Sequence, residues 1–365
     1  MLERITIIGV GLIGGSLGMA VKRLGLAAEV IGVGRNEDNL RLAVEVGAVD
    51  KTTTDLRRGV TEASVVVVAT PVSAIIPVVS EISPYLEAGT TVTDVGSTKA
   101  AVVRALEPLA ETRGFYFVGG HPMAGSEITG VKGADPYLFE NAYYILTTTP
   151  KTRPEPLAQI RDLAMSVGAR VVELSPESHD LYVATVSHLP HCVAAALANT
   201  VSDLPEREAV LPFAAGGFRD TTRVAAGDPV MWRDIILSNA DTILDMLDRF
   251  DSSIADLTAL IRSGDAAGLE DWLTKAQSLR RVVPAKSKGY LPELCEIVVT
   301  VPDKPGIIAG LAGILGNAGI NICDIEILRV REGEGGTIRL GFARSVDQED
   351  AVILLRNAGI ETRKR

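Results

Sequence analysis

Residues 4–21 read RITIIGVGLIGGSLGMAV, a stretch in which a short β-rich run meets a glycine turn and then a helical pattern. The turn at residues 9–14 is a GxGxxG sequence. Gly9 permits the tight bend, Gly11 lets the backbone approach a pyrophosphate, and Gly14 lets the helix and the strand pack closely. In this strand–helix setting the hexapeptide predicts a dinucleotide-binding site, although glycine turns also serve packing alone.

The start of the following helix supports this prediction. The main-chain N–H groups of Leu12 and Ile13, with the positive end of the helix dipole, can face the phosphates of a cofactor. A NAD site usually has Asp or Glu at the end of the second strand for the ribose 2′-hydroxyl, whereas this chain has Gly34 and Arg35. We therefore expect NAD(P)+ as cofactor, with NADP+ permitted, unless Arg35 is only a solvated loop residue.

Further β-rich runs follow at intervals suited to strand–helix units. They lie at residues 29–34, 64–70, 90–96, 115–120, 141–149 and 169–174. Runs without polar alternation are typical of strands buried on both faces, and hence of a parallel sheet. We expect residues 1–174 to form a Rossmann-type, doubly wound α/β domain.

Strand signals stop after residue 174. Apolar residues recur in steps of three and four from Ile236 to Ile261, which predicts one long amphipathic helix that Asp228 and Pro229 start. Residues 175–285 should therefore form an all-helical domain. The apolar stripe suits packing within the chain as well as against a second subunit, and we expect a homodimer.

Residues 292–365 change pattern again. β-rich runs at residues 295–301, 320–330 and 337–343 alternate with two helical runs in the order βαββα, and residues 360–365 are a possible last strand. Two similar βα halves predict a split βαβ, ferredoxin-like α+β domain.

Composition narrows the range of functions. The net charge of −10 gives no basic surface to follow a phosphate backbone, so we expect no nucleic-acid partner. The three cysteines lack CxxC spacing, which argues against disulfides or a zinc site and for the cytoplasm. The apolar stretches at residues 1–21 and 63–80 are interrupted by charges, glycines or prolines, so we expect neither a signal peptide nor a membrane span.

His121 is a candidate proton acceptor. It lies in GGHPMAGSE, just beyond the fifth strand run and so at the carboxyl edge of the sheet, where open α/β sheets bind ligands. A histidine there can take a substrate proton while hydride moves, although it could be a loop residue held by carbonyl groups. DVGSTK at residues 94–99 should open onto the same crevice, and Ser97 could cap the next helix, face the substrate, or both.

The other three histidines, His179, His188 and His191, fall within ESHDLYVATVSHLPHC at residues 177–192. A metal site needs converging ligands, but Pro190 should disturb the helix between the last two histidines, and no carboxylate-rich motif follows. We therefore expect no metal. His179, at an expected helix start, could be merely solvated.

The motifs GVGLIGGS, DVGSTK, GGHPMAGSE, SHLPH and GGFRDTTRVAAGDPVMW, in this order, closely resemble the prephenate dehydrogenase family. The segment VPDKPGIIAGLAGILGNAGINI resembles an ACT domain, a small regulatory module that binds amino acids. The resemblance implies oxidative decarboxylation of prephenate to 4-hydroxyphenylpyruvate in tyrosine biosynthesis, with NAD+ as the usual cofactor.

The family pattern also implies roles for single residues. His121 accepts the proton of the ring hydroxyl, and Ser97 helps to orient that hydroxyl. His191 and Arg223 look like substrate ligands, and the planar guanidinium of Arg223 suits a carboxylate. Further family positions, which bind substrate or order the site, are Asp180, Ser187, His188, Asp220 and Trp232. Without the family, Trp232 would be read as a core aromatic.

In the ACT resemblance, the turn after the first strand is where an amino acid commonly binds. It contributes Asp303, Pro305 and Gly306, and Asn321 lies across the same edge. The resemblance implies feedback inhibition by tyrosine, the end product, through a changed arrangement of ACT domains. An ACT domain kept for assembly alone is the alternative.

Three other functions need weighing. A β-hydroxyacid dehydrogenase needs a catalytic lysine on the helical domain, and the absence of lysine between Lys151 and Lys275 counts strongly against it. A sensor without chemistry would not need His121, Ser97 and Arg223 together. Arogenate, the amino counterpart of prephenate, stays open as substrate, because the sequence does not locate the contacts that separate the two.

Overall fold

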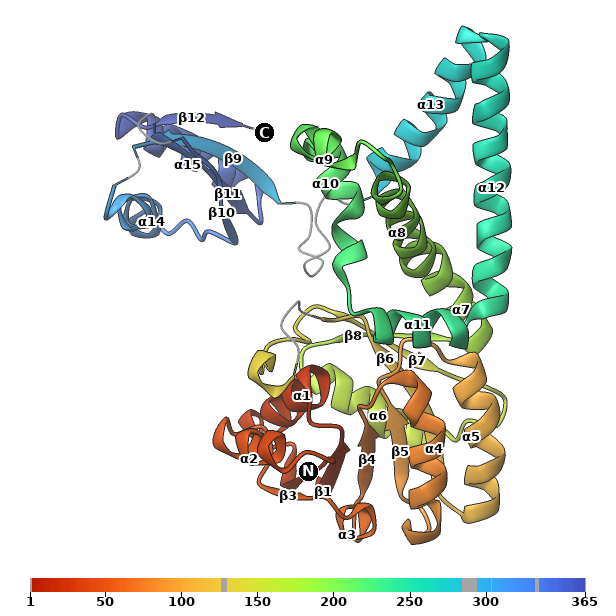
Figure 1. Ribbon diagram of the computed structural model, residues 1–365. Helices are drawn as coiled ribbons and strands as arrows, with labels where there is room; N and C mark the ends of the chain where they lie inside the picture. The colour runs from red at the N-terminus through yellow and green to blue at the C-terminus, as the bar shows by residue number, and fades with distance from the viewer. Residues whose placement is uncertain (1, 126–129, 284–293, 303, 332–334, 365) are drawn as a thin grey trace. The chain divides into compact units, whose positions relative to one another are not determined.

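The computed structural model describes residues 2–125, 130–283, 294–302, 304–331 and 335–364. Contacts divide the chain into two compact units, Met1–Ala285 and Lys286–Arg365. Figure 1 shows a Rossmann-type sheet and a helical segment in the first unit, and a small α+β fold in the second. The expected fold class is confirmed, whereas the domain boundary between residues 174 and 175 stays a prediction.

An eight-stranded sheet forms the core of the first unit, in the order β3-β2-β1-β4-β5-β6-β7-β8. The strands are β1 (Leu2–Ile8), β2 (Ala27–Val33), β3 (Lys51–Thr53), β4 (Val65–Val68), β5 (Thr91–Asp94), β6 (Tyr116–Pro122), β7 (Tyr143–Thr147) and β8 (Arg170–Leu174). β1 to β6 are parallel, but β7 is antiparallel to β6. β8 is parallel to β7 and so also runs against β1 to β6. The expectation of a wholly parallel sheet is therefore wrong at β7 and β8, since β-branched and aromatic residues suit strands of either direction.

Helices cover both faces of this sheet. α1 (Leu12–Arg23), α2 (Glu37–Glu45) and α6 (Pro154–Ser166) pack on one face, and α3 (Leu56–Val60), α4 (Val72–Ile82) and α5 (Ala100–Arg113) pack on the other. Val65 and Val67 join the first core, whereas Val66 and Val68 join the second. Burial on both faces explains why this run lacks polar alternation.

The helical segment of the first unit follows β8. It consists of α7 (Pro176–Val183), a π-helical turn (Ala184–His188), α8 (Leu189–Ser202), α9 (Arg207–Val210), α10 (Gly216–Thr222), α11 (Pro229–Ser238), α12 (Ala240–Ser263) and α13 (Ala266–Val282). Within the described residues, the run Pro176–Ser202 is the one helix long and apolar enough to cross a membrane by length and composition. It nevertheless buries His179, Asp180 and His188 inside the folded unit. Pro190 does not end this helical run, but the regular α-helical pattern is disturbed directly before it, in the π-helical turn Ala184–His188.

One long helix is expected from Ile236 to Ile261, but the structure has two. Asn239 leaves the helical conformation with φ −127° and ψ 32°, and it separates α11 from α12. The apolar steps of three and four run across this break, so periodicity could not reveal it. Asp228 accordingly caps α11 and not the longer helix.

The second unit is an antiparallel sheet in the order β10-β11-β9-β12 with two helices. Its elements are β9 (Cys295–Val301), α14 (Ile307–Asn317), β10 (Asp324–Arg331), β11 (Gly335–Phe342), α15 (Ser345–Asn357) and β12 (Glu361–Lys364). Ile297, Val299 and Leu340 of the sheet pack with Leu311 of α14 and Leu355 of α15. The order βαββαβ is the split βαβ fold that the sequence predicts.

Candidate active site

The turn between β1 and α1 has the geometry that a dinucleotide phosphate needs. Gly9 has a φ of +96°, and a Cβ there would lie 2.6 Å from the carbonyl oxygen of Ala69. A Cβ on Gly14 would lie 2.2 Å from Gly9 O, so only glycine allows α1 to approach this closely. A Cβ on Gly11 would meet nothing within 4 Å, so Gly11 faces open space. The residues present therefore fit a pyrophosphate over Gly11.

The start of α1 is open to the same ligand. Among the described residues, no side chain caps this helix. The N–H groups of Leu12 and Ile13 can therefore donate to a phosphate. At the end of β2, Arg35 is exposed, whereas the side chain of Asn36 is occupied in capping α2. Arg35 is thus the side chain at this strand end that can meet a 2′-phosphate.

Asp94 links the loop that carries Ser97 to the end of β6, which carries His121. β5 ends at Asp94, whose side chain is fully buried. Its carboxylate accepts hydrogen bonds from the main-chain N–H of Gly96, next to Ser97, at 2.8 Å and from that of Gly120, next to His121, at 3.2 Å. It also forms an ion pair with the fully buried Lys99. Burial lowers the pKa of Lys99, and the Asp94 charge opposes that shift. Both candidate residues therefore lie, half-buried, at one braced edge of the sheet.

Helix α5, which follows Ser97, is capped by a residue of another element. The carboxylate of Asp180 in α7 accepts from Lys99 N at 2.7 Å and from Ala100 N at 2.9 Å. The expectation that Ser97 could cap this helix is therefore wrong, and its hydroxyl is not used in that way. Asn239 Nδ2 donates to the main-chain oxygen of Asp180 at 2.9 Å, so the break between α11 and α12 braces the same residue.

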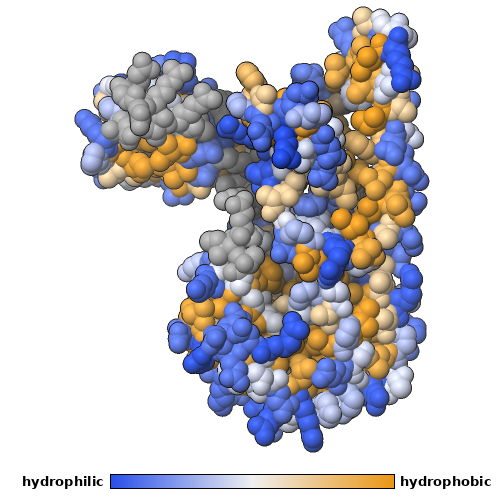
Figure 2. Space-filling view, viewed as in Figure 1, coloured by the Kyte–Doolittle hydropathy of each residue, from blue (hydrophilic) through white to orange (hydrophobic). Residues whose placement is uncertain are grey.

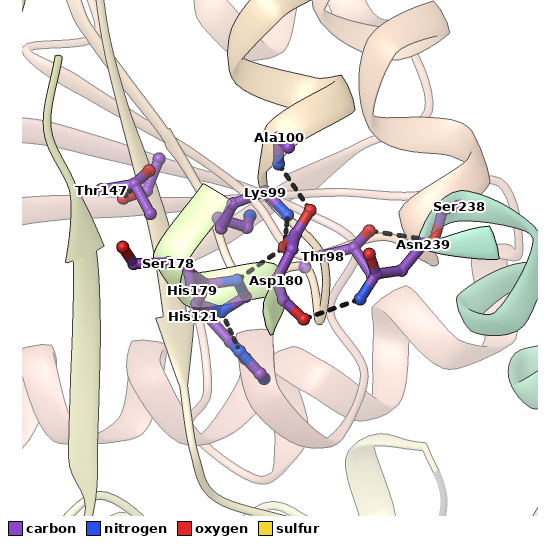
Figure 3. A network of polar contacts seen from close by, with 12 residues as sticks. Thr98, Lys99, Ala100, His121, Thr147, Ser178, His179, Asp180, Ser238 and Asn239 are labelled. Atoms are coloured by element: carbon purple, nitrogen blue, oxygen red, sulfur yellow. Dashed lines mark hydrogen bonds and ion pairs between the residues drawn. The ribbon is translucent and has the colours of Figure 1, made fainter. Parts of the chain in front are cut away.

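A chain of polar contacts leads from His121 to Asp180 (Figure 3). His121 Nδ1 lies 2.8 Å from His179 Nε2, and His179 Nδ1 lies 2.8 Å from Asp180 Oδ1. His179 is 0% exposed, so the expectation that it could be merely solvated is wrong. The sequence could not show this contact, because two strands and a helix separate His121 from His179 along the chain.

The surroundings keep His121 neutral. Burial, followed by the neighbouring His179, Lys99 and His188, holds the pKa of His121 well below its ordinary value. His188 itself is buried, and its pKa is lowered to about 4, chiefly by burial. A neutral imidazole at the edge of a dinucleotide-binding sheet can accept a proton at neutral pH, which suits general-base chemistry.

His191 stacks on Trp232. Their ring centroids are 3.5 Å apart with an interplanar angle of 10°, and His188 meets the same indole edge-on at 6.1 Å. A Cβ on Gly227 would lie 2.5 Å from Trp232 Nε1, so this turn must be glycine for the stack to form. His191 Nδ1 is buried without a hydrogen-bond partner among the described atoms. A substrate group could satisfy it.

The other candidates lie close along the chain to this stack. Ser187 is half-buried in the π-helical turn, and Asp220 lies on α10. Arg223 begins a 3-10 turn that contacts α8, the helix that carries His191. Across the described part of the chain, no group of three or more His, Cys, Asp or Glu side chains could hold a metal ion.

Comparison with known proteins agrees with this geometry. The nucleotide-binding domain model of prephenate dehydrogenase matches residues 17–173, its dimerization domain model matches residues 175–275, and the ACT domain model matches residues 296–355. The chain is 38% identical over 356 residues to the prephenate dehydrogenase of Bacillus subtilis, which covers 96% of this chain and 95% of that protein.

Solved structures give the same result. The chain resembles prephenate dehydrogenase from Aquifex aeolicus, solved with hydroxyphenyl propionate and NAD+, with a TM-score of 0.73 and 34% identity over 78% of this chain and 99% of that one. It resembles Synechocystis arogenate dehydrogenase with a TM-score of 0.68 and 33% identity over 76% and 99%. With its dinucleotide turn, its histidine at the sheet edge and these matches, the chain belongs to the prephenate dehydrogenase family of NAD(P)-dependent oxidoreductases.

Proposed function

We propose that this chain catalyses the oxidative decarboxylation of prephenate to 4-hydroxyphenylpyruvate in the cytoplasm, as a step of tyrosine biosynthesis. The observation that supports this most directly is the neutral, half-buried His121 at the carboxyl edge of a sheet whose first turn fits a dinucleotide. NAD(P)+, when bound, accepts the hydride from the ring carbon that carries the hydroxyl.

The side chains of this chain handle the proton and the carboxylates. His121 takes the hydroxyl proton while hydride leaves, and Ser97 orients the hydroxyl toward it. The ring carbonyl formed in this way weakens the bond to the ring carboxylate, so carbon dioxide leaves and its electron pair completes the aromatic ring. His121 then returns the proton to the phenolate oxygen. Arg223 and His191 hold the substrate, with Ser187, Asp220 and Trp232 ordering that side of the site.

Steady-state kinetics with prephenate and arogenate, each with NAD+ and NADP+, tests this function. We expect reduced cofactor, carbon dioxide and 4-hydroxyphenylpyruvate in equal amounts from prephenate. If the protein turned over arogenate but not prephenate, the proposed substrate would be wrong. If it turned over neither, the proposed function would be wrong.

Arg35 offers a test of cofactor choice. Because it can pair with a 2′-phosphate, Arg35→Ala should raise KM for NADP+ about tenfold, with a much smaller effect for NAD+. Arg41→Ala on the next helix is a matched control, since the exposed Arg41 pairs with Asp38 instead. If Arg35→Ala raised KM equally for NAD+ and NADP+, Arg35 would not bind the 2′-phosphate.

The ACT unit is proposed to bind tyrosine and lower activity. Gly306, with φ +88°, is the N-cap residue of α14 and follows Pro305 directly. Asn321 is exposed before β10, whereas Asp303 lies outside the described residues. A chain ended after residue 285 should keep turnover and lose inhibition by tyrosine, because the first unit is compact by itself. Full-length protein with added phenylalanine controls for general amino-acid effects, and inhibition that survives the truncation would contradict the proposal.

A second copy of the chain is the expected partner. Figure 2 shows hydrophobic side chains gathered along the helices of the first unit, and Leu244, Ile261 and Leu279 are 57%, 61% and 68% exposed. Since α12 buries only Ile243 and α13 buries none of its described residues, the apolar stripe is not satisfied within the chain. Light scattering should give the mass of two chains, and Ile261→Asp should shift it toward one. A wild-type monomer would contradict this.

A further inference from the structure

We propose that His179 and Asp180 form a positioning pair that keeps the proton of neutral His121 on Nδ1 and so presents the Nε2 lone pair to the substrate hydroxyl. The inference rests on the proposed function in one respect only, namely that His121 is the proton acceptor. The positions of the protons follow from contacts within the chain.

The proton positions can be deduced from Asp180 outward. Its carboxylate accepts hydrogen bonds from the main-chain N–H groups of Lys99 and Ala100, at 2.7 and 2.9 Å. An ionised carboxylate can accept hydrogen bonds but cannot donate them. His179 Nδ1, at 2.8 Å from Oδ1, must therefore donate. A neutral imidazole carries one N–H, so His179 Nε2 is an acceptor. His121 Nδ1, at 2.8 Å from that acceptor, must then be the donor, which leaves His121 Nε2 as a base.

The pair is held rigidly enough to impose this arrangement. His179 and Asp180 are 0% and 3% exposed, so water cannot replace either partner. The two imidazoles meet edge to face, with centroids 5.0 Å apart and an interplanar angle of 67°, so the ring of His121 is fixed in direction as well as in distance. Ser175 caps the start of α7, and Asn239 holds the main chain of Asp180.

Charged and titratable groups surround His121 from several elements. They are His179 and Asp180 of α7, Asp94 at the end of β5, Lys99 before α5 and His188 of the π-helical turn. The charge of Lys99 is largely matched by Asp94, with which it forms an ion pair. Asp180 therefore supplies a negative charge, relayed through His179, when His121 becomes an imidazolium during the reaction.

The tautomer of His121 is the direct test, and it needs no substrate. The chain has only four histidines, so 15N-labelled imidazoles of the full-length protein give few signals in NMR spectra, and His121→Asn assigns one of them. We expect both His121 and His179 to carry their proton on Nδ1 at neutral pH. A proton on Nε2 of His121 would overturn the inference.

A matched pair of variants tests the consequence for catalysis. In His179→Gln the amide lies near the former Nε2 and can still accept from His121, whereas in His179→Asn it lies near the former Nδ1 and can bond only to Asp180. We expect His179→Asn to lower kcat about 10- to 100-fold, a part of the about 10²–10⁴-fold that a positioned base contributes, with little change in KM for prephenate. His179→Gln should recover most of that loss.

A purely structural role for His179 predicts the opposite order, because His179→Asn keeps the bond to Asp180 and thus the cap of α5. That order, or equal losses with equal falls in melting temperature, would overturn the inference. If the wild-type protein turned over no prephenate, the proposed function would fall, while the NMR result would still decide the tautomer.

Discussion

Replacing His121 with asparagine should lower kcat for prephenate about 10²–10⁴-fold, because the hydroxyl proton then has no base to receive it while hydride leaves. KM for the cofactor should change little, since His121 lies on β6 and the dinucleotide turn lies between β1 and α1. Cofactor binding and the melting curve of the variant provide the control for folding. A loss below about tenfold would show that another group accepts the proton.

The pH dependence of the wild-type protein follows from the same residue. Only the neutral imidazole accepts a proton, so activity is present above the pKa of His121 and is lost as the pH falls through it. Burial and the neighbouring His179, Lys99 and His188 place that pKa well below the ordinary value of 6.5. The acid limb of kcat/KM should therefore lie below pH 6.5, and it should disappear in His121→Asn. An acid limb near neutral pH would contradict the role of burial.

Replacing Arg223 with alanine should raise KM for prephenate about 10- to 150-fold, with a smaller change in kcat. Hydrogen bonds to a charged group contribute about 1.5–3 kcal/mol, and a guanidinium can hold both oxygens of a carboxylate. Arg223→Lys keeps the charge and loses the fork, so its effect should be intermediate.

Arg219→Ala is a matched control for this substitution. Arg219 lies one turn earlier, on α10. Steady-state kinetics at saturating cofactor separates the two variants. If Arg219→Ala and Arg223→Ala raised KM equally, general attraction by positive charge would explain the effect, and Arg223 would not be a specific ligand.

The sequence is most informative where a function depends on neighbouring residues. The roles of Gly9, Gly11 and Gly14 depend on three positions within six residues, so the pattern can be read directly and the turn has the geometry predicted. The direction of β7 and β8 and the break at Asn239 cannot be predicted from the sequence. β-branched and aromatic residues suit strands of either direction, and an apolar stripe continues across one non-helical residue.

Contacts between distant segments are what the sequence does not show. His179 is the least informative histidine in the sequence, because nothing in ESHDLYV indicates that α7 lies against the end of β6 that carries His121. The family pattern predicts that Asp180 orders the site, but its role as the cap of α5 requires the fold. The one local signal is an Asp next to a His at a helix start, a pairing that often orients an imidazole. The buried ion pair of Asp94 and Lys99 also lies within one motif, DVGSTK, because both residues are part of it. Within that motif, a role is predicted from the sequence only for Ser97.

The double use of Asp180 has a consequence for modular engineering. The same carboxylate starts α5 in the sheet region and orients His179 toward His121. A fragment of residues 1–174 would retain the dinucleotide turn. It would leave the N–H groups of Lys99 and Ala100 without the carboxylate that accepts from them, and His121 without the residue that fixes which ring nitrogen carries its proton. Cofactor recognition can therefore be transplanted with the sheet, whereas proton transfer cannot, and a chimera that exchanges the helical segment must bring a matching Asp180 with it.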